Sequence, residues 1–203
     1  CFFFNYHSDI CFLGLSTEWM AKTIILPVDL ISSFSWVQYD QVNKELSLST
    51  EPFTPANESQ WMTFSFEITG KQIRVPVVIE GIPVRLFLDT GGGFLLNLNK
   101  NVVEQLFEKR PDLQKIRKKK SASLTPYLHG KVDELIFTPK TIQFGDATLN
   151  NATIAYSEGA ADPNSFPYEG SMGIEMFKKT AMVLDFEKKL MWVKKTKGSL
   201  FEP

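Results

Sequence analysis

Three consecutive residues in the middle of the chain, Asp89, Thr90 and Gly91, have the types and order needed to present an acid at a sharp turn. The apolar run "VRLFL" precedes Asp89 and predicts a buried strand that ends at the carboxylate. Glycine lets the backbone turn tightly, and the Thr90 hydroxyl can hydrogen-bond a neighbouring loop. A carboxylate held on a rigid strand end could act as an acid or a base in catalysis. The tripeptide alone is weak evidence, because it occurs by chance in many chains.

The segment before Asp89 predicts the strands that would hold this turn. Apolar and polar residues alternate from Met62 to Ile68, as in a half-buried strand, and Gly70-Lys71 marks a turn. A second strand follows in "QIRVPVVIE", and Glu80-Gly81 is typical of a hairpin turn. The run "IPVRLFLD" then forms the strand that leads into the acid.

The segment after Asp89 predicts one short helix and more strands. "NKNVVEQLFEK" has Asn at a cap position and apolar residues at helical spacing. "ELIFTPKTIQFGDATLNNATIAYS" reads as strands broken at proline, glycine and asparagine turns. A loop around Pro163 and Pro167, a helical turn at "GIEMFKK" and the strands "TAMVLDF" and "KLMWVKK" complete the pattern. The fold expected is an all-β closed sheet with one or two short helices.

The order of these features resembles the retropepsin-like aspartic proteases, especially the bacterial single-lobe members. In that family a strand pair and hairpin lead to Asp-Thr-Gly, a short helix and a flap hairpin, and the first part reads here as "IRVPVVIEGIPVRLFLDTGGGFLLNLNKNVVEQL". The family closes with an apolar-Gly turn, a short helix and a strand ending in Asp, matched by "EGSMGIEMFKKTAMVLDFEKKLMWVK". The resemblance covers about Trp61 to Lys195. It implies a retropepsin-like, or acid protease, closed β-barrel lobe.

The resemblance also implies an aspartic endopeptidase in which Asp89, Thr90 and Gly91 form the catalytic turn. Such enzymes pair two carboxylates that share one proton, so that one activates water and the other protonates the scissile carbonyl oxygen. This chain has a single Asp-Thr-Gly, so the second Asp is expected from an identical copy in a symmetric homodimer. The expected partner is a peptide or protein substrate, with no metal and no cofactor.

By the same resemblance, a flap that closes over the substrate would lie between the two motifs. "TPYLHGKVDELIF" around Gly130 is its best candidate. His129 and Gly130, together with Gly92 and Gly93, are the expected substrate-binding residues. For His129 and Tyr127 the alternative is an exposed loop side chain with no special role.

Two positions depart from the family pattern. Family members usually have Ala or Ser directly after Asp-Thr-Gly, whereas this chain has Gly92 and Gly93. The closing turn has Ser171-Met172 where two apolar residues are common. The alternative function is therefore a non-catalytic peptide-binding or assembly domain that keeps the protease fold.

Other acidic residues are weaker candidates for the catalytic pair. Asp185 follows "AMVL", matches a structural position of the family and begins a polar hairpin. Asp29, Asp40 and Glu175 have no glycine turn beside them and are expected to be surface or capping groups.

The chain divides into an N-terminal segment, residues 1–60, and a retropepsin-like domain, residues 61–203. "LPVDLISSFSWVQYDQVNKELSLS" in the first part has the same order of features as "MGIEMFKKTAMVLDFEKKLMWVKK" near the end. Each contains an acidic residue in a short apolar turn, then a strand, a polar hairpin and another strand. The segment could be the end of a preceding, duplicated lobe, or the two could be unrelated hairpins of similar composition.

Composition and charge narrow the kinds of partner, metal site and cellular location that the sequence allows. A formal charge of -1 gives no global field that would favour nucleic acid or an anionic membrane, and the basic run from Glu108 to Lys120 is expected to be a solvated loop. Two cysteines, Cys1 and Cys11, make no disulfide framework, and no spacing suggests a metal site. No apolar run approaches the roughly 20 residues that span a bilayer. A periplasmic or extracytoplasmic location, with a lipid on Cys1 as one option, is favoured over a cytoplasmic one.

Overall fold

The computed structural model describes residues 26–91, 94–114, 117–125, 128–149, 152–157 and 169–201, with side chains omitted for 114–134 and 157. Gly92, Gly93, Tyr127, both cysteines and the loop around Pro163 lie outside the described residues.

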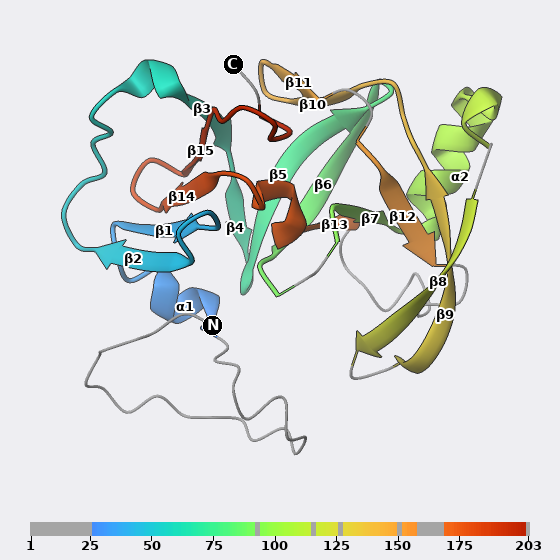
Figure 1. Cartoon of the computed structure of the whole chain (residues 1–203), viewed down its shortest axis with the longest axis horizontal. Coiled ribbons are helices and arrows are strands. Elements are labelled where there is room, and N and C mark those ends of the chain that lie inside the picture. The colour runs from blue at the N-terminus through green and yellow to red at the C-terminus, as the bar shows by residue number, and fades with distance from the viewer. Residues whose placement is uncertain are drawn as a thin grey trace.

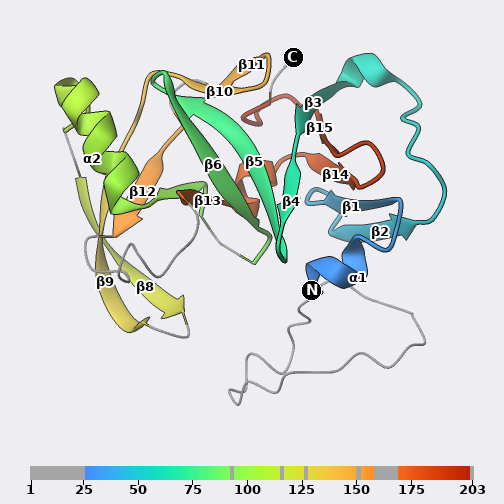
Figure 2. The same ribbon diagram turned by 180° about the vertical axis from the view of Figure 1, so that it is seen from behind.

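Two β-sheets make up most of the described chain (Figure 1). The first is five-stranded, in the order β2-β1-β14-β15-β3, and joins the N-terminal hairpin to the last strands of the chain. The second is ten-stranded, in the order β11-β10-β5-β6-β13-β7-β12-β9-β8, with β4 paired to β5. Figures 1 and 2 show the smaller sheet on one side of the molecule and the helix α2 at the far side of the larger one. The strands are β1 (Trp36–Asp40), β2 (Glu45–Ser49), β3 (Trp61–Ser65), β4 (Glu67–Thr69), β5 (Gln72–Ile79), β6 (Ile82–Asp89), β7 (Leu96–Leu98), β8 (Arg117–Thr125), β9 (Leu128–Phe137), β10 (Ile142–Phe144), β11 (Ala147–Leu149), β12 (Ile154–Ser157), β13 (Gly170–Gly173), β14 (Ala181–Asp185) and β15 (Leu190–Lys194).

Helices in the described residues are short. The α-helices are α1 (Val28–Ile31) and α2 (Lys100–Lys109), and the 3-10 helices are η2 (Glu58–Gln60), η3 (Pro111–Gln114) and η4 (Ile174–Phe177). The all-β class with one or two short α-helices that was predicted from the sequence is confirmed, and the larger sheet curls into a half-barrel.

The β5–β6 hairpin carries the candidate acid and follows its sequence pattern closely. Its two strands pair from Arg74↔Phe87 to Ile79↔Ile82. Glu80 and Gly81 between them both have positive φ, 49° and 77°, as a two-residue hairpin turn of the primed type requires. The predicted turn at Glu80-Gly81 is therefore confirmed.

Four phenylalanines pack in the core between the two sheets. Phe64 of β3 packs edge-on against Phe144 of β10, with ring centroids 5.6 Å apart. Phe177 of η4 stacks on Phe201 at 5.7 Å. All four side chains are buried, so this cluster joins elements that are distant in the sequence.

The basic run from Glu108 to Lys120 is not the loop predicted from its charge. It comprises the end of α2, the 3-10 helix η3 and the start of β8. β8 pairs with β9 along its whole length, from Arg117↔Ile136 to Thr125↔Leu128. The hydrogen-bonding partner strand, which lies later in the chain, overrides the local preference of a lysine run for irregular backbone.

Candidate active site

Asp89 is the last residue of β6, an interior strand of the larger sheet, and is half-buried. Leu86 and Leu88 of the same strand are buried and anchor it in the core. The Asp89 carboxylate turns back over its own loop, where Oδ1 accepts a hydrogen bond from the Gly91 amide at 3.0 Å. In the described part of the chain no lysine or arginine forms a salt bridge with Asp89.

The closing motif lies directly beside this turn. β13 pairs in parallel with β6, so that Gly173 is opposite Asp89 and Met172 is opposite Leu88. On its other side β13 pairs with β7, and the Gly173 amide donates to the carbonyl of Leu95 at 2.9 Å. The two motifs quoted from the sequence are thus adjacent in space, and together they fix the backbone on both sides of the acid.

The start of β13 has room only for a residue without a side chain, and Gly170 occupies it. A Cβ atom at this position would lie 2.6 Å from the carbonyl oxygen of Asn97 and 2.7 Å from a methyl of Leu98. Both distances are shorter than van der Waals contact, so a larger residue would push β13 away from β7.

Thr90 is exposed, and its side chain approaches the phenol of Tyr39 in β1. Tyr39 itself is buried, and its burial raises the pKa of the phenol to about 12, an effect that the nearby Thr90 side chain partly offsets. The sequence predicted a partner for the Thr90 hydroxyl in a neighbouring loop, but not this tyrosine. One indication of this contact was present in the sequence. In the repeated hairpin pattern Tyr39 stands at the position where the second copy has Leu184.

Asp185, the rival for the second acid, is held in a structural role. Its side chain is 2% exposed, and Oδ1 accepts from the Lys188 amide at 2.9 Å. Oδ2 faces Lys188 Nζ at 3.3 Å. These contacts lie within the β14–β15 turn, as expected from the polar hairpin that follows "AMVL".

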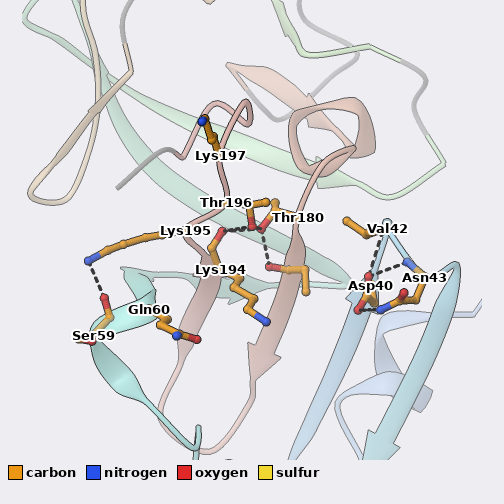
Figure 3. Close-up of a pocket in the computed structure, with 11 residues that line it drawn as sticks. Asp40, Val42, Asn43, Ser59, Gln60, Thr180, Lys194, Lys195, Thr196 and Lys197 are labelled. Atoms are coloured by element: carbon orange, nitrogen blue, oxygen red, sulfur yellow. Dashed lines mark hydrogen bonds between the residues drawn. The ribbon is translucent and has the colours of Figure 1, made fainter.

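The remaining acids that the sequence set aside also have local partners. Asp29 pairs with Lys71 at 3.2 Å and Glu175 with Lys178 at 3.0 Å. Asp40 Oδ1 accepts from the amides of Val42 and Asn43, both at 2.9 Å. Figure 3 shows these bonds at the rim of a surface hollow of about 620 Å³ between the ends of β1 and β14.

The hollow in Figure 3 and a second one of about 440 Å³ are both lined by residues other than Asp89. The larger hollow has lysines at positions 194, 195 and 197, of which Lys195 Nζ donates to the carbonyl of Ser59 at 2.9 Å.

The predicted flap region is a long β-hairpin. His129 lies opposite Leu124 and Gly130 opposite Ser123 in the β8–β9 ladder. β9 also pairs with β12, which in turn pairs with β7, the strand that follows the Asp89 turn. The hairpin extends from the larger sheet at the end where the chain leaves β6 (Figure 1). The backbone of His129 and Gly130 therefore lies in the hairpin at the β8 edge of the larger sheet, with β13, β7 and β12 between it and β6.

Among the described residues, no helix is long and apolar enough to cross a membrane. The same part of the chain contains no group of three or more His, Cys, Asp or Glu side chains arranged to hold a metal ion. Cys1 lies outside the described residues, so a lipid on it stays a prediction.

No family model and no curated protein matches the sequence. Three examples illustrate the similarity to solved structures. One is a retropepsin-like aspartic protease from Rickettsia conorii, with a TM-score of 0.45 and 15% identity, covering 66% of this chain and 89% of that one. The others are basic 7S globulin from soybean (TM-score 0.38, 10% identity, 80% of this chain) and conglutin gamma from lupine seeds (TM-score 0.41, 10% identity, 83% of this chain). The matched regions cover 51% and 55% of these two globulins.

Proposed function

We propose that this chain supplies one of the two catalytic carboxylates of an aspartic peptidase. The observation that carries the proposal is the arrangement around Asp89: a half-buried acid at a strand end, bonded to the Gly91 amide and held beside Gly173. A carboxylate in this position is fixed by backbone alone. It is also free of a cationic partner in the described residues, and its neighbour Thr90 is exposed.

The chemistry requires a second carboxylate close to Asp89, because two acids at short range share one proton. The ionised acid takes a proton from water while the water oxygen bonds to the scissile carbonyl carbon. The protonated acid gives its proton to the carbonyl oxygen. The carbon–nitrogen bond then breaks as the amine takes a proton, so one water is consumed for each peptide bond.

The proposed substrate is an extended peptide that lies against the β8–β9 hairpin as an added strand. His129 and Gly130 belong to that hairpin, and Gly92 and Gly93 follow the acid in the sequence. We keep these four residues as the proposed substrate contacts.

A symmetric homodimer, as predicted from the sequence, is one source of the second acid. Its subunits would meet with two copies of Asp89 face to face. The edge of β14 is already paired with β1 of the same chain, so a dimer could not form through that edge.

The test is cleavage of a mixture of extended peptides at mildly acidic pH by the natural protein and by its Asp89→Asn variant. We expect the variant to lose at least about 10³-fold in kcat/KM, because it removes an acid that is needed for both proton transfers. In H₂¹⁸O, each new carboxyl group should contain one ¹⁸O. Asp112→Asn, at an exposed acid far along the chain, is the matched control and should keep full activity. Undiminished cleavage by Asp89→Asn would remove the proposal, and peptide binding without cleavage would favour the non-catalytic domain instead.

A further inference from the structure

The N-terminal hairpin repeats the C-terminal hairpin strand for strand. β1 begins at Trp36 and β14 at Ala181, which are 145 residues apart, and the starts of β2 and β15, Glu45 and Leu190, are also 145 residues apart. All four strands have five residues, and a short helix precedes each hairpin. The similarity that the sequence indicated is therefore a similarity of structure.

The turns of the two hairpins also agree in detail. Asp40 and Asp185 each end the first strand, and each accepts a hydrogen bond at 2.9 Å from the amide three residues later. In each turn the fourth residue after the aspartate has the left-handed backbone conformation, with φ of 60° and 56°. These residues are Lys44 and Lys189.

The two hairpins meet at equivalent residues. β1 and β14 pair antiparallel with Gln38 opposite Val183 at the centre, and these residues are themselves 145 positions apart. A rotation of 180° about this pair exchanges the two strands and reproduces the register on both sides, where Val37↔Leu184 becomes Tyr39↔Met182. Two unrelated hairpins would have no reason to pair in this way, whereas two copies of one motif related by a two-fold axis must do so.

The Asp-Thr-Gly turn at residues 89–91 lies close to the two-fold axis through the Gln38–Val183 pair. Tyr39 is the neighbour of Gln38, and its side chain reaches Thr90. Leu184 is the equivalent of Tyr39 and points to the same face of the sheet, because it pairs with Val37. The rotation therefore places a second acidic turn against Leu184, next to the exposed Thr90 and Gly91.

We infer that residues 28–49 are the closing hairpin of a second lobe of the same fold. This lobe, rather than another copy of the chain, supplies the carboxylate that faces Asp89. A homodimer about this axis would need β14 to pair with its own copy, and β1 already occupies that edge. The inference names the partner for the proposed peptidase and rests on that function for its catalytic part.

The free edge of β2 marks where the lobe continues. β3 pairs with β15 along five residues, whereas β2, the equivalent of β15, forms the edge of the sheet in the described part of the chain. An edge strand presents unpaired amides and carbonyls. The occupant of this edge is the second lobe's equivalent of β3, which would extend the sheet to six strands.

Disulfide trapping in the 203-residue chain, with Cys1 and Cys11 changed to Ser, tests the geometry. Directly opposite residues of an antiparallel pair lie within disulfide range, so Gln38→Cys/Val183→Cys should oxidise within one molecule and remain monomeric. Val183→Cys alone should stay a monomeric thiol. A disulfide between two copies of Val183→Cys would place β14 against β14 and overturn the inference.

A second experiment tests the inference on the natural polypeptide. Peptide mapping should find an acid followed closely by glycine about 145 residues before Asp89, the spacing of the repeated strands. Changing that acid to its amide should abolish cleavage as Asp89→Asn does, and absence of such a turn would overturn the inference.

The two arms separate this inference from the proposed function. Cross-linked dimers of Val183→Cys with cleavage that depends on Asp89 would keep the peptidase and remove the second lobe. An intramolecular disulfide and the upstream turn, in a protein that cleaves no peptide, would keep the lobe and remove the peptidase.

Discussion

The side chain of Tyr39, in the N-terminal hairpin, lies close to the side chain of Thr90, the middle residue of the Asp-Thr-Gly turn. The two residues are 51 positions apart in the sequence, and β1, which carries Tyr39, is held in the five-stranded sheet by its pairing with β14. The N-terminal hairpin is thus part of the framework of the candidate site.

The buried Tyr39 phenol makes the stability of the protein sensitive to alkaline pH. Its pKa is about 12 in the folded protein against 10.0 for an exposed tyrosine, so the folded state holds the proton more tightly. This contribution is complete below about pH 10 and is lost as the pH rises to about 12. Between these pH values the wild type should lose about 2 kcal/mol more stability than Tyr39→Phe in urea unfolding. Parallel losses in the two proteins would contradict the burial of Tyr39.

Glu80 should be a strong stability determinant of the β5–β6 hairpin. Its side chain is 4% exposed and forms an ion pair with Arg110, and Oε1 accepts from the Thr141 amide at 3.1 Å. Glu80→Ala leaves Arg110 and the amide without this acceptor, so we expect a loss of roughly 3 kcal/mol in the free energy of unfolding. Asp112→Ala removes the exposed partner of the same arginine and should cost much less, because an exposed ion pair contributes little to stability. Equal effects would show that the buried pair is not formed.

Phe53 covers the outer face of the five-stranded sheet. Its ring meets Trp36, Trp61 and Trp192 edge-on at centroid distances of 5.5, 5.8 and 5.5 Å. Phe53→Ala should destabilise the protein by about 3 kcal/mol and shift the tryptophan fluorescence to longer wavelength. Val42→Ala, at a side chain that is 60% exposed, should change neither. Unchanged fluorescence in Phe53→Ala would place Phe53 away from the tryptophans.

Gly170 links the sheet to the position of the acid. A Cβ at residue 170 would clash with Asn97, and β13 continues from there to Gly173 beside Asp89. Gly170→Ala should therefore lower stability by about 1 to 3 kcal/mol and reduce peptide cleavage, while Ser171→Ala should do neither. A Gly170→Ala protein with native Tm and full activity would contradict the close packing of β13 against β7.

The strands around Asp89 could be predicted from the sequence because their signals are local. Alternation in "MTFSFEI" gives the buried Phe64 and Phe66, and Glu80-Gly81 gives the two-residue turn. The same is true of the strand that ends at Asp89 and of the turn that holds Asp185.

Features that depend on distant pairing could not be predicted in this way. The lysines at 117–120 become strand because β9 lies beside them, and Tyr39 reaches Thr90 only through the β1–β14 register. The sequence showed the repeated hairpin as a pattern. That the two copies meet at Gln38 and Val183 is a property of the folded sheet.

The most direct measurement for the central claim is the distance from the Asp89 carboxylate to the nearest other carboxylate in a crystal structure of the natural protein. We expect the closest oxygens to lie about 3 Å apart, the separation at which two acids share a proton, with the second acid on the turn that contacts Leu184. An Asp89 whose nearest carboxylate is more than about 6 Å away, or which is paired with a lysine or arginine, would contradict the account.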